Sequence, residues 1–190
     1  MKRLVSFFLV LMMTLSLAAC GENGLSLRPG GPNSSSSVDT YKEGGAKGYI
    51  GDVLHTYWFD FVVNSTKLCQ EYEGYTAYDG YQLLVLDMSI KNTVDFSIPM
   101  GWSDFPILWG DGDEDYAYPL AKDEFNATRN IFPDEYKLGI NENKSGVLVY
   151  EVPVTDVPDY ILLYWEIFDD GTEEGEEGDT YVVYFTAEQQ

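Results

Sequence analysis

The chain has 190 residues, of which 32 are Asp or Glu and 11 are Lys or Arg, so its formal charge is −21. Apolar residues make up 45% of the sequence and aromatic residues 15%. This is enough material for a hydrophobic core and excludes a chain that is disordered throughout. The charge argues against nucleic-acid binding, which needs clustered cations. Two Cys and one His argue against a His/Cys zinc site and a disulfide framework.

The N-terminus has the pattern of a secretory signal peptide. A basic start at Lys2 and Arg3 precedes an apolar run over residues 4–19 that ends in small residues. The run is too short for a transmembrane helix, which needs about twenty residues. We therefore predict a lipoprotein-type signal peptide over residues 1–19. The alternative is an N-terminal anchor that stays uncleaved.

The end of this run, Leu17, Ala18, Ala19 and Cys20, resembles the lipobox of bacterial lipoproteins. The resemblance implies that the Cys20 thiol carries a diacylglyceryl group, and two acyl chains are enough for stable anchoring. We expect a mature protein that begins at Cys20 and is held by its lipid on the extracytoplasmic face of the bacterial cell membrane. Loss of the two cations in the signal peptide changes the formal charge to about −23.

Residues 20–46 have the composition of a disordered tether. Of these 27 residues, 15 are Gly, Ser, Pro or Asn, and no apolar period is visible. Such a segment does not bury enough surface to offset its ordering entropy, and its expected span is about 30 Å. Residues 47–190 have the length of one domain, which we expect to be monomeric.

Short apolar segments rich in Val, Ile, Tyr, Phe and Trp follow one another through this domain, which is the signature of strands. Alternating side chains predict strands over residues 57–63, 84–90, 148–152, 161–167 and 181–185. Residues 105–109 and 116–120 are expected to pair across a turn, and a short helical turn is predicted over residues 133–136. About seven strands with alternating faces predict an all-β fold, an antiparallel sandwich of two sheets.

Two segments resemble an immunoglobulin-like domain of unknown function found in surface lipoproteins of Gram-positive bacteria. Residues 81–93 resemble a central strand of that domain, and residues 146–153 resemble its Gly-led strand ending in Pro. The Pro-Gly turn usual before the second strand is absent, and residues 138–145 stand in its place. The resemblance covers roughly residues 51–185. It implies an immunoglobulin-like sandwich and brings no catalytic residues with it.

Residues suited to catalysis are few. His55 is the only His and lies in a strand pattern, where a structural role is typical. Cys69 is the one thiol left after lipidation, and it is either a Cys–His nucleophile with His55 or a small half-buried apolar residue. Glycoside hydrolysis needs only two carboxylates, but among 32 acids a fitting pair arises by chance. We predict that the protein is not an enzyme.

The four Trp residues are candidates for stacking against a ligand. Trp58 and Trp165 lie in predicted strands, so we expect them in the core. Trp102 and Trp109 flank a Gly- and Asp-rich loop and are the candidates for an exposed platform that stacks on a saccharide.

The loop between the paired segments offers oxygen ligands for calcium at alternate positions, Asp111, Asp113 and Asp115. It is not an EF-hand, because Tyr116 and Lys122 stand where that motif needs Gly and Glu. A polar hairpin tip explains the same residues.

A longer acidic run covers residues 169–179, in which seven of eleven residues are acidic, and Asp169 and Asp170 are further calcium candidates. From residue 145 to the end there are twelve acids and no Lys or Arg. The run is either a solvated loop or a surface that collects divalent cations or a basic protein patch. A calcium-induced melting shift that sodium at matched ionic strength does not reproduce would indicate a site.

Three hypotheses for function follow. The first is a lipid-anchored, non-catalytic binding module whose partner is an unknown protein or small ligand, with no nucleic acid involved. The second is an envelope accessory protein that binds calcium or a soluble ligand, and the third is a carboxylate-based glycoside hydrolase. No cofactor is expected apart from the lipid on Cys20 and, under the second hypothesis, Ca²⁺.

Overall fold

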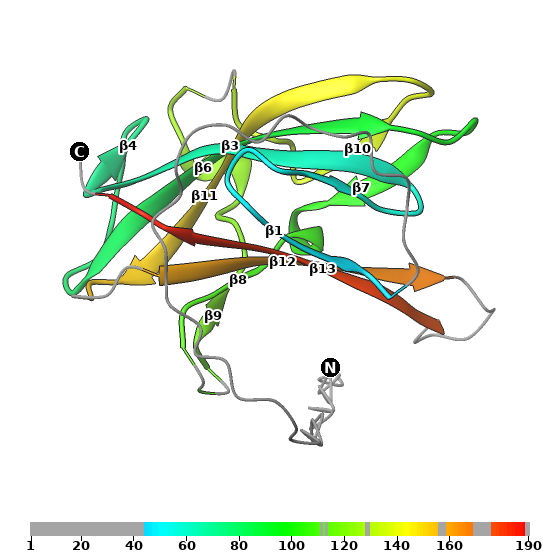
Figure 1. Cartoon of the computed structure of the whole chain (residues 1–190). Coiled ribbons are helices and arrows are strands. Elements are labelled where there is room, and N and C mark those ends of the chain that lie inside the picture. The colour runs from blue at the N-terminus through cyan, green and yellow to red at the C-terminus, as the bar shows by residue number, and fades with distance from the viewer. Residues whose placement is uncertain are drawn as a thin grey trace, which may run out of the picture. The chain divides into compact units, whose positions relative to one another are not determined.

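The alternating apolar segments form strands that stack as two sheets, as Figure 1 shows in the computed structural model. The structure describes residues 44–110, 112, 114–127, 130–155, 159–168 and 176–188. The predicted all-β sandwich is confirmed. Among the described residues, no helix is long and apolar enough to cross a membrane.

One sheet has five strands in the order β1-β13-β12-β8-β9. The strands are β1 (Ala46–Tyr49), β13 (Glu176–Thr186), β12 (Asp159–Phe168), β8 (Ile107–Leu108) and β9 (Tyr116–Ala117). The pairing of β8 with β9 confirms the hairpin expected between residues 105–109 and 116–120. Strand β1 runs parallel to β13, whereas the other pairs in this sheet are antiparallel.

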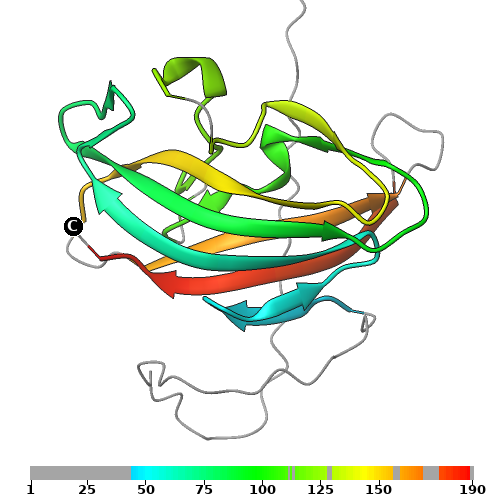
Figure 2. The same cartoon turned by 90° about the horizontal axis from the view of Figure 1, so that it is seen from above.

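The second sheet has four strands in the order β11-β6-β3-β2, all antiparallel. They are β11 (Asn143–Pro153), β6 (Tyr81–Asn92), β3 (Phe59–Cys69) and β2 (Val53–His55). Figure 2 shows the long strands β11, β6 and β3 lying over the other layer. The two segments that resemble the immunoglobulin-like domain are neighbours here, because residues 81–92 form β6 and residues 146–153 lie in β11.

Short elements complete the fold. They are β4 (Glu71–Tyr72), β5 (Tyr75–Thr76), β7 (Ile98–Gly101), β10 (Glu135–Leu138) and the 3₁₀ turns η1 (Trp102–Asp104) and η2 (Lys122–Glu124). The helical turn predicted over residues 133–136 was wrong, since β10 begins at Glu135 and pairs with β7. The reason is packing: Leu138 is fully buried and Tyr136 lies against the core, so this segment alternates like a strand.

The main core lies between the two sheets. Leu84, Leu86, Met88 and Ile90 of β6 all point into it, which confirms the predicted phase of that strand. Tyr150 of β11 is also buried there, and its hydroxyl donates a hydrogen bond of 2.7 Å to the carbonyl of Phe105. This bond ties the four-stranded sheet to the segment that leads into β8.

A second, smaller core covers part of the outer side of the four-stranded sheet. Leu83 and Val85 of β6 contact Phe125 and Ile131 from the long connection between β9 and β10. The same connection covers the edge of β11, where the N–H of Leu120 donates to the carbonyl of Val149. Strand β6 is therefore buried on both faces from Gln82 to Leu86.

In strand β12 the side chains that face the core are not those on the side of its Trp. Tyr160, Leu162 and Tyr164 point into the core, and the side chain of Trp165 points outward with 38% of its surface exposed. The prediction that Trp165 is a core residue was therefore wrong. Both faces of β12 carry large apolar side chains, so alternation alone does not decide which face is buried. Trp58 is half-buried and packs against the core, as expected.

Candidate functional site

One residue from each strand of the five-stranded sheet lies in a single row across the sheet. Tyr49 lies opposite Tyr184, Tyr184 opposite Ile161, Ile161 opposite Leu108, and Leu108 opposite Tyr116. Residues that lie directly opposite in a ladder share a face, and the row crosses four strand spacings, or about 19 Å. Every side chain in it is apolar or aromatic.

The row belongs to a larger apolar surface on the side of the sheet that faces away from the core. We define the outer face as Tyr49, Leu108, Tyr116, Ile161, Leu163, Trp165, Ile167, Val182 and Tyr184. None of these side chains is buried, and the exposed fraction reaches 67% for Tyr49 and 54% for Ile167. Contiguous exposed apolar surface of this kind marks an interaction site.

The sheet that carries the outer face is acidic. Its strands contain five acids and one Lys: Asp159, Glu166, Glu176, Glu177, Asp179 and Lys47. The strands of the other sheet are balanced, with three acids and three Lys: Asp60, Asp87, Glu151, Lys67, Lys91 and Lys144. Of the two sheets, the one that carries the outer face is therefore the one with a net negative charge in its strands.

An aromatic ladder continues from one edge of the outer face. The ring of Tyr116 lies 5.8 Å from that of Tyr118, which lies 5.1 Å from the indole of Trp102, and both contacts are edge-on. Trp102 is 44% exposed, in agreement with the prediction that it is available for stacking. Trp109 instead packs half-buried against the main core. The described ring contacts pair Trp102 with Tyr118 and not with Trp109.

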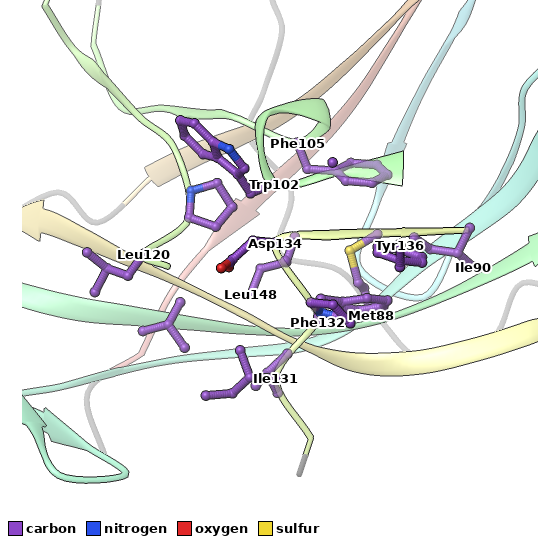
Figure 3. Close-up of a pocket in the computed structure, with 15 residues that line it drawn as sticks. Met88, Ile90, Trp102, Phe105, Leu120, Ile131, Phe132, Asp134, Tyr136 and Leu148 are labelled. Atoms are coloured by element: carbon purple, nitrogen blue, oxygen red, sulfur yellow. The ribbon is translucent and has the colours of Figure 1, made fainter. Parts of the chain in front are cut away.

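A small cavity lies behind Trp102 (Figure 3). Its lining includes Met88, Phe105, Phe132 and Asp134. The carbonyl of Asp134 accepts a hydrogen bond of 2.8 Å from the N–H of Trp102, which joins the backbones of two residues in the lining. The cavity volume is about 10 Å³, enough for about one water molecule. This cavity therefore does not hold a ligand of sugar size.

The four-stranded sheet carries an open polar groove of about 490 Å³ on its outer side. Lys67, Tyr72, Asp87 and Ser145 are among the residues that line it. The Lys67 ammonium lies 5.3 Å from the centre of the Tyr72 ring, and the Asp87 carboxylate accepts a hydrogen bond of 2.6 Å from Asn64. A groove lined by both an ammonium and a carboxylate suits a small polar molecule that carries both charges.

Asp115 closes the turn between β8 and β9. Its carboxylate accepts a hydrogen bond of 2.8 Å from the N–H of Gly112, and its carbonyl accepts one of 3.1 Å from Trp109. The other calcium candidates, Asp111, Asp113, Asp169 and Asp170, lie outside the described residues, as does the lipidation site Cys20. Within the described part of the chain, no three His, Cys, Asp or Glu side chains form a metal-binding group. Calcium binding at these loops stays a prediction.

His55 and Cys69 do not form a catalytic pair. Nδ1 of His55 lies 2.7 Å from Oδ1 of Asp60, near the start of β3. Cys69 ends the same strand nine residues later, which corresponds to roughly 30 Å along the strand. Burial raises the pKa of the Cys69 thiol, although the Lys67 charge partly offsets this effect. A raised pKa is the opposite of what activates a thiolate nucleophile.

Glu166 is a buried carboxylic acid that the sequence analysis missed. It lies on the inward side of β12, and its Oε1 accepts a hydrogen bond of 2.5 Å from the N–H of Tyr57. Burial raises the pKa of this carboxyl, while hydrogen bonds from the backbones of Tyr57 and Asp179 and from the Tyr181 hydroxyl lower it. The one feature of the sequence that could have indicated its burial is its place between Trp165 and Ile167. Both of these side chains point outward, so the residue between them points inward.

Aromatic rings pack together at the same end of the sandwich. Phe168 lies 5.4 Å from Trp58 and 5.5 Å from Tyr57. The ring of Phe96 lies 5.9 Å from that of Trp58. Tyr57 and Phe96 are about half exposed, so this cluster extends the aromatic surface of the molecule beyond the outer face.

Comparison with known proteins identifies the fold and no family. No protein-family model matches the chain, and no curated protein matches it either. The solved structure of yjhA from Bacillus subtilis superposes with a TM-score of 0.54 at 22% identity, covering 72% of this chain and 97% of yjhA. The structure of ycdA from the same organism gives 0.50 at 12% identity and covers 71% of this chain. The match spans only 38% of ycdA, and both identities show a shared fold alone.

Proposed function

We propose that this protein is a lipid-anchored surface lipoprotein whose immunoglobulin-like sandwich serves as a non-catalytic binding module. The observation that carries the proposal is the outer face, whose apolar side chains cross all five strands of one sheet. None of them is buried, although Leu108, Ile161 and Tyr184 are half-buried. A sheet face of this kind is normally covered by another layer, and here a binding partner would supply that layer.

Two observations support the anchor. The lipobox pattern at residues 17–20 follows directly after a signal-type apolar run. The structural neighbour ycdA is itself named as a candidate lipoprotein. The immunoglobulin-like assignment is supported by the pairing of β6 with β11, because the two segments that carry the resemblance lie side by side in one sheet.

A non-catalytic role is supported by where the candidate groups lie. His55 lies in β2 beside the start of β3, Cys69 ends β3, and the Asp115 carboxylate closes a turn. The described surface offers a broad apolar face and a polar groove, which suit binding by contact area more than bond making.

The proposal is tested by photo-crosslinking on intact cells. A photoreactive amino acid is placed at Tyr49 or Trp165 on the outer face, and at Tyr78, which is 70% exposed outside that face, as the matched control. We expect an adduct of one defined mass from positions 49 and 165 and none from position 78. The same adducts from all three positions, or none from the face, would reject the binding role.

The polar groove favours a second candidate function, the capture of a small soluble ligand. The Lys67 ammonium and the Asp87 carboxylate both line this groove, and two opposite charges fit a zwitterion such as an amino acid. Free amino acids should then raise the melting temperature of the wild-type protein, and Asp87→Asn should abolish that increase. A melting temperature that no amino acid changes would count against this function.

A further inference from the structure

We propose that the outer face binds a basic polypeptide segment, whose apolar side chains lie on the centre of the face and whose Lys or Arg side chains meet acids at its two ends. The inference rests on the proposed binding role and adds the chemistry of the partner. Two observations support it, the order of side chains along β12 and the negative charge of this sheet. The same charge disfavours a second copy of the chain and an anionic lipid surface as the occupant.

The outward side of β12 has acids at both ends and apolar side chains between them. Asp159 opens the strand and is exposed, and Ile161, Leu163 and Trp165 follow on the same side. After the bulge, Ile167 lies opposite the exposed Glu177 of β13. From Asp159 to Ile167 the strand extends roughly 26 Å. A partner laid along this line would meet a carboxylate, an apolar stretch and a second carboxylate.

The apolar stretch is wide as well as long. The row from Tyr49 to Tyr116 crosses the sheet over about 19 Å, with Ile161 at its centre. Within the five strands, Lys47 is the one cation, and it lies opposite Val182 on β1 at the edge of the sheet. The centre of the face is thus free of charge, and the charge at the ends of β12 is negative.

This charge pattern disfavours a second copy as the occupant. A two-fold interface places the same patch on both partners, so Asp159 and Glu177 of one copy would meet the acids of the other. The formal charge of −21 on each chain adds a further repulsion. An anionic lipid surface is repelled for the same reason.

A basic segment with apolar side chains fits both the uncharged centre of the outer face and the acids at the ends of β12. Its apolar side chains would cover the outer face, and its cations would pair with the terminal acids, which adds specificity and speeds association. The other sheet does not compete for this role, because the second core covers part of its outer side and its strand charges are balanced.

Two synthetic helical peptides with the same Leu positions test the inference, one with Lys at every polar position and one with Glu. The probes are titrated against the mature lipidated protein in neutral phosphatidylcholine nanodiscs, and empty nanodiscs serve as the blank. We expect the Lys peptide to bind at least ten-fold more tightly than the Glu peptide, with an affinity that falls as salt is raised.

Variants then locate the binding. Trp165→Ala and Tyr49→Ala should each lower the affinity for the Lys peptide at least five-fold, whereas Tyr78→Ala should leave this affinity unchanged. Glu177→Lys should also weaken it, while Glu71→Lys, the same change at an exposed acid of β4, should have a smaller effect. Circular dichroism checks that each variant is folded.

Three outcomes would overturn the inference. Equal affinity for both peptides would show that charge does not select the partner, although the face would still be a binding surface and the proposed function would stand. If the Lys peptide still binds after both Trp165→Ala and Tyr49→Ala, its binding site lies elsewhere on the acidic surface. A concentration-dependent dimer that Trp165→Ala abolishes would make a second copy the occupant. Absence of face-specific adducts on cells would instead reject the binding role itself.

Discussion

The backbone N–H of Tyr57 donates a hydrogen bond of 2.5 Å to Oε1 of Glu166, and the two residues are 109 positions apart in the chain. Tyr57 lies in the turn before β3, and Glu166 lies on the inward side of β12. The bond therefore joins the two sheets at one end of the sandwich. It also places a carboxylic acid in the interior, where the charged form is disfavoured.

The stability of the protein should depend on pH through Glu166. Burial raises its folded-state pKa above the ordinary value of 4.5, so the folded state binds the proton more tightly than the unfolded chain does. The stability this gives is fully present below 4.5 and is lost as the pH rises through the raised pKa. Glu166→Gln keeps an acceptor for Tyr57 and removes the titration. Its melting temperature relative to wild type should be higher at pH 7 than at pH 4.

The exposed Glu71→Gln provides the control for this measurement, because it removes one acid from a very acidic chain without touching the interior. If the melting temperatures of Glu166→Gln and wild type differ by the same amount at both pH values, the raised pKa assigned to burial is contradicted. A pH-dependent difference of equal size in Glu71→Gln would trace the effect to net charge instead.

Gly178 makes room for this buried acid. A Cβ built at Gly178 would lie 2.4 Å from Cε2 of Phe168 and 2.8 Å from Cβ of Glu166. Gly178→Ala should therefore destabilise the protein by about 1–3 kcal/mol, the usual cost of overpacking. Urea denaturation measures the change. Gly101→Ala is the control, because a Cβ there meets its nearest atoms at 3.9 Å and should be tolerated.

The sequence was sufficient to predict strand β6 and insufficient to orient strand β12. In β6 the alternation of Leu84, Leu86 and Met88 with polar Asp87 and Ser89 distinguishes the two faces. In β12 the odd positions from Ile161 to Ile167 are apolar, and the even positions from Tyr160 to Tyr164 are apolar or aromatic, so either set could face the core by the alternation rule. Only the packing of the even positions against the second sheet decides between them.

The candidate site depends even more on tertiary structure. Tyr49 and Tyr116 belong to segments far apart in the chain, and only the strand order places them at the two ends of one row. Glu166 escaped prediction because a Glu in a strand is normally exposed. Trp102 could be predicted as accessible from its Gly- and Asp-rich surroundings, but its contact with Tyr118 could not.

The two faces of β12 should respond differently to the same truncation. Leu162 is 1% exposed and lies in the main core, so Leu162→Ala should cost about 2–5 kcal/mol of unfolding free energy. Ile167 is 54% exposed on the outer face, and Ile167→Ala should cost less than about 1 kcal/mol. Chemical denaturation of both variants measures this difference. Equal losses would mean that the outer face is covered within the folded monomer.

The hydrogen bond between Tyr150 and Phe105 should contribute measurably to stability. Tyr150→Phe removes the hydroxyl and leaves the buried carbonyl of Phe105 without this donor. The expected loss is about 1–3 kcal/mol, seen as a lower denaturation midpoint with an unchanged slope. Tyr184→Phe, made at a partly exposed ring on the outer face, is the matched control and should change the midpoint little. A midpoint equally low in both variants would argue against a specific role for this bond.

Anchoring through Cys20 gives the last prediction. If the chain is processed as a lipoprotein, the mature protein lacks residues 1–19, carries two or more acyl chains on Cys20 and fractionates with the membrane. Mass spectrometry of the protein isolated from its host should show this mass, and globomycin should block the processing. Cys20→Ala should stay unprocessed or be released, whereas Cys69→Ala, the matched change at the other Cys, should remain anchored. A mature mass that lacks residues 1–19 and carries no lipid would show that the protein is secreted without an anchor, and the outer face would then act in solution.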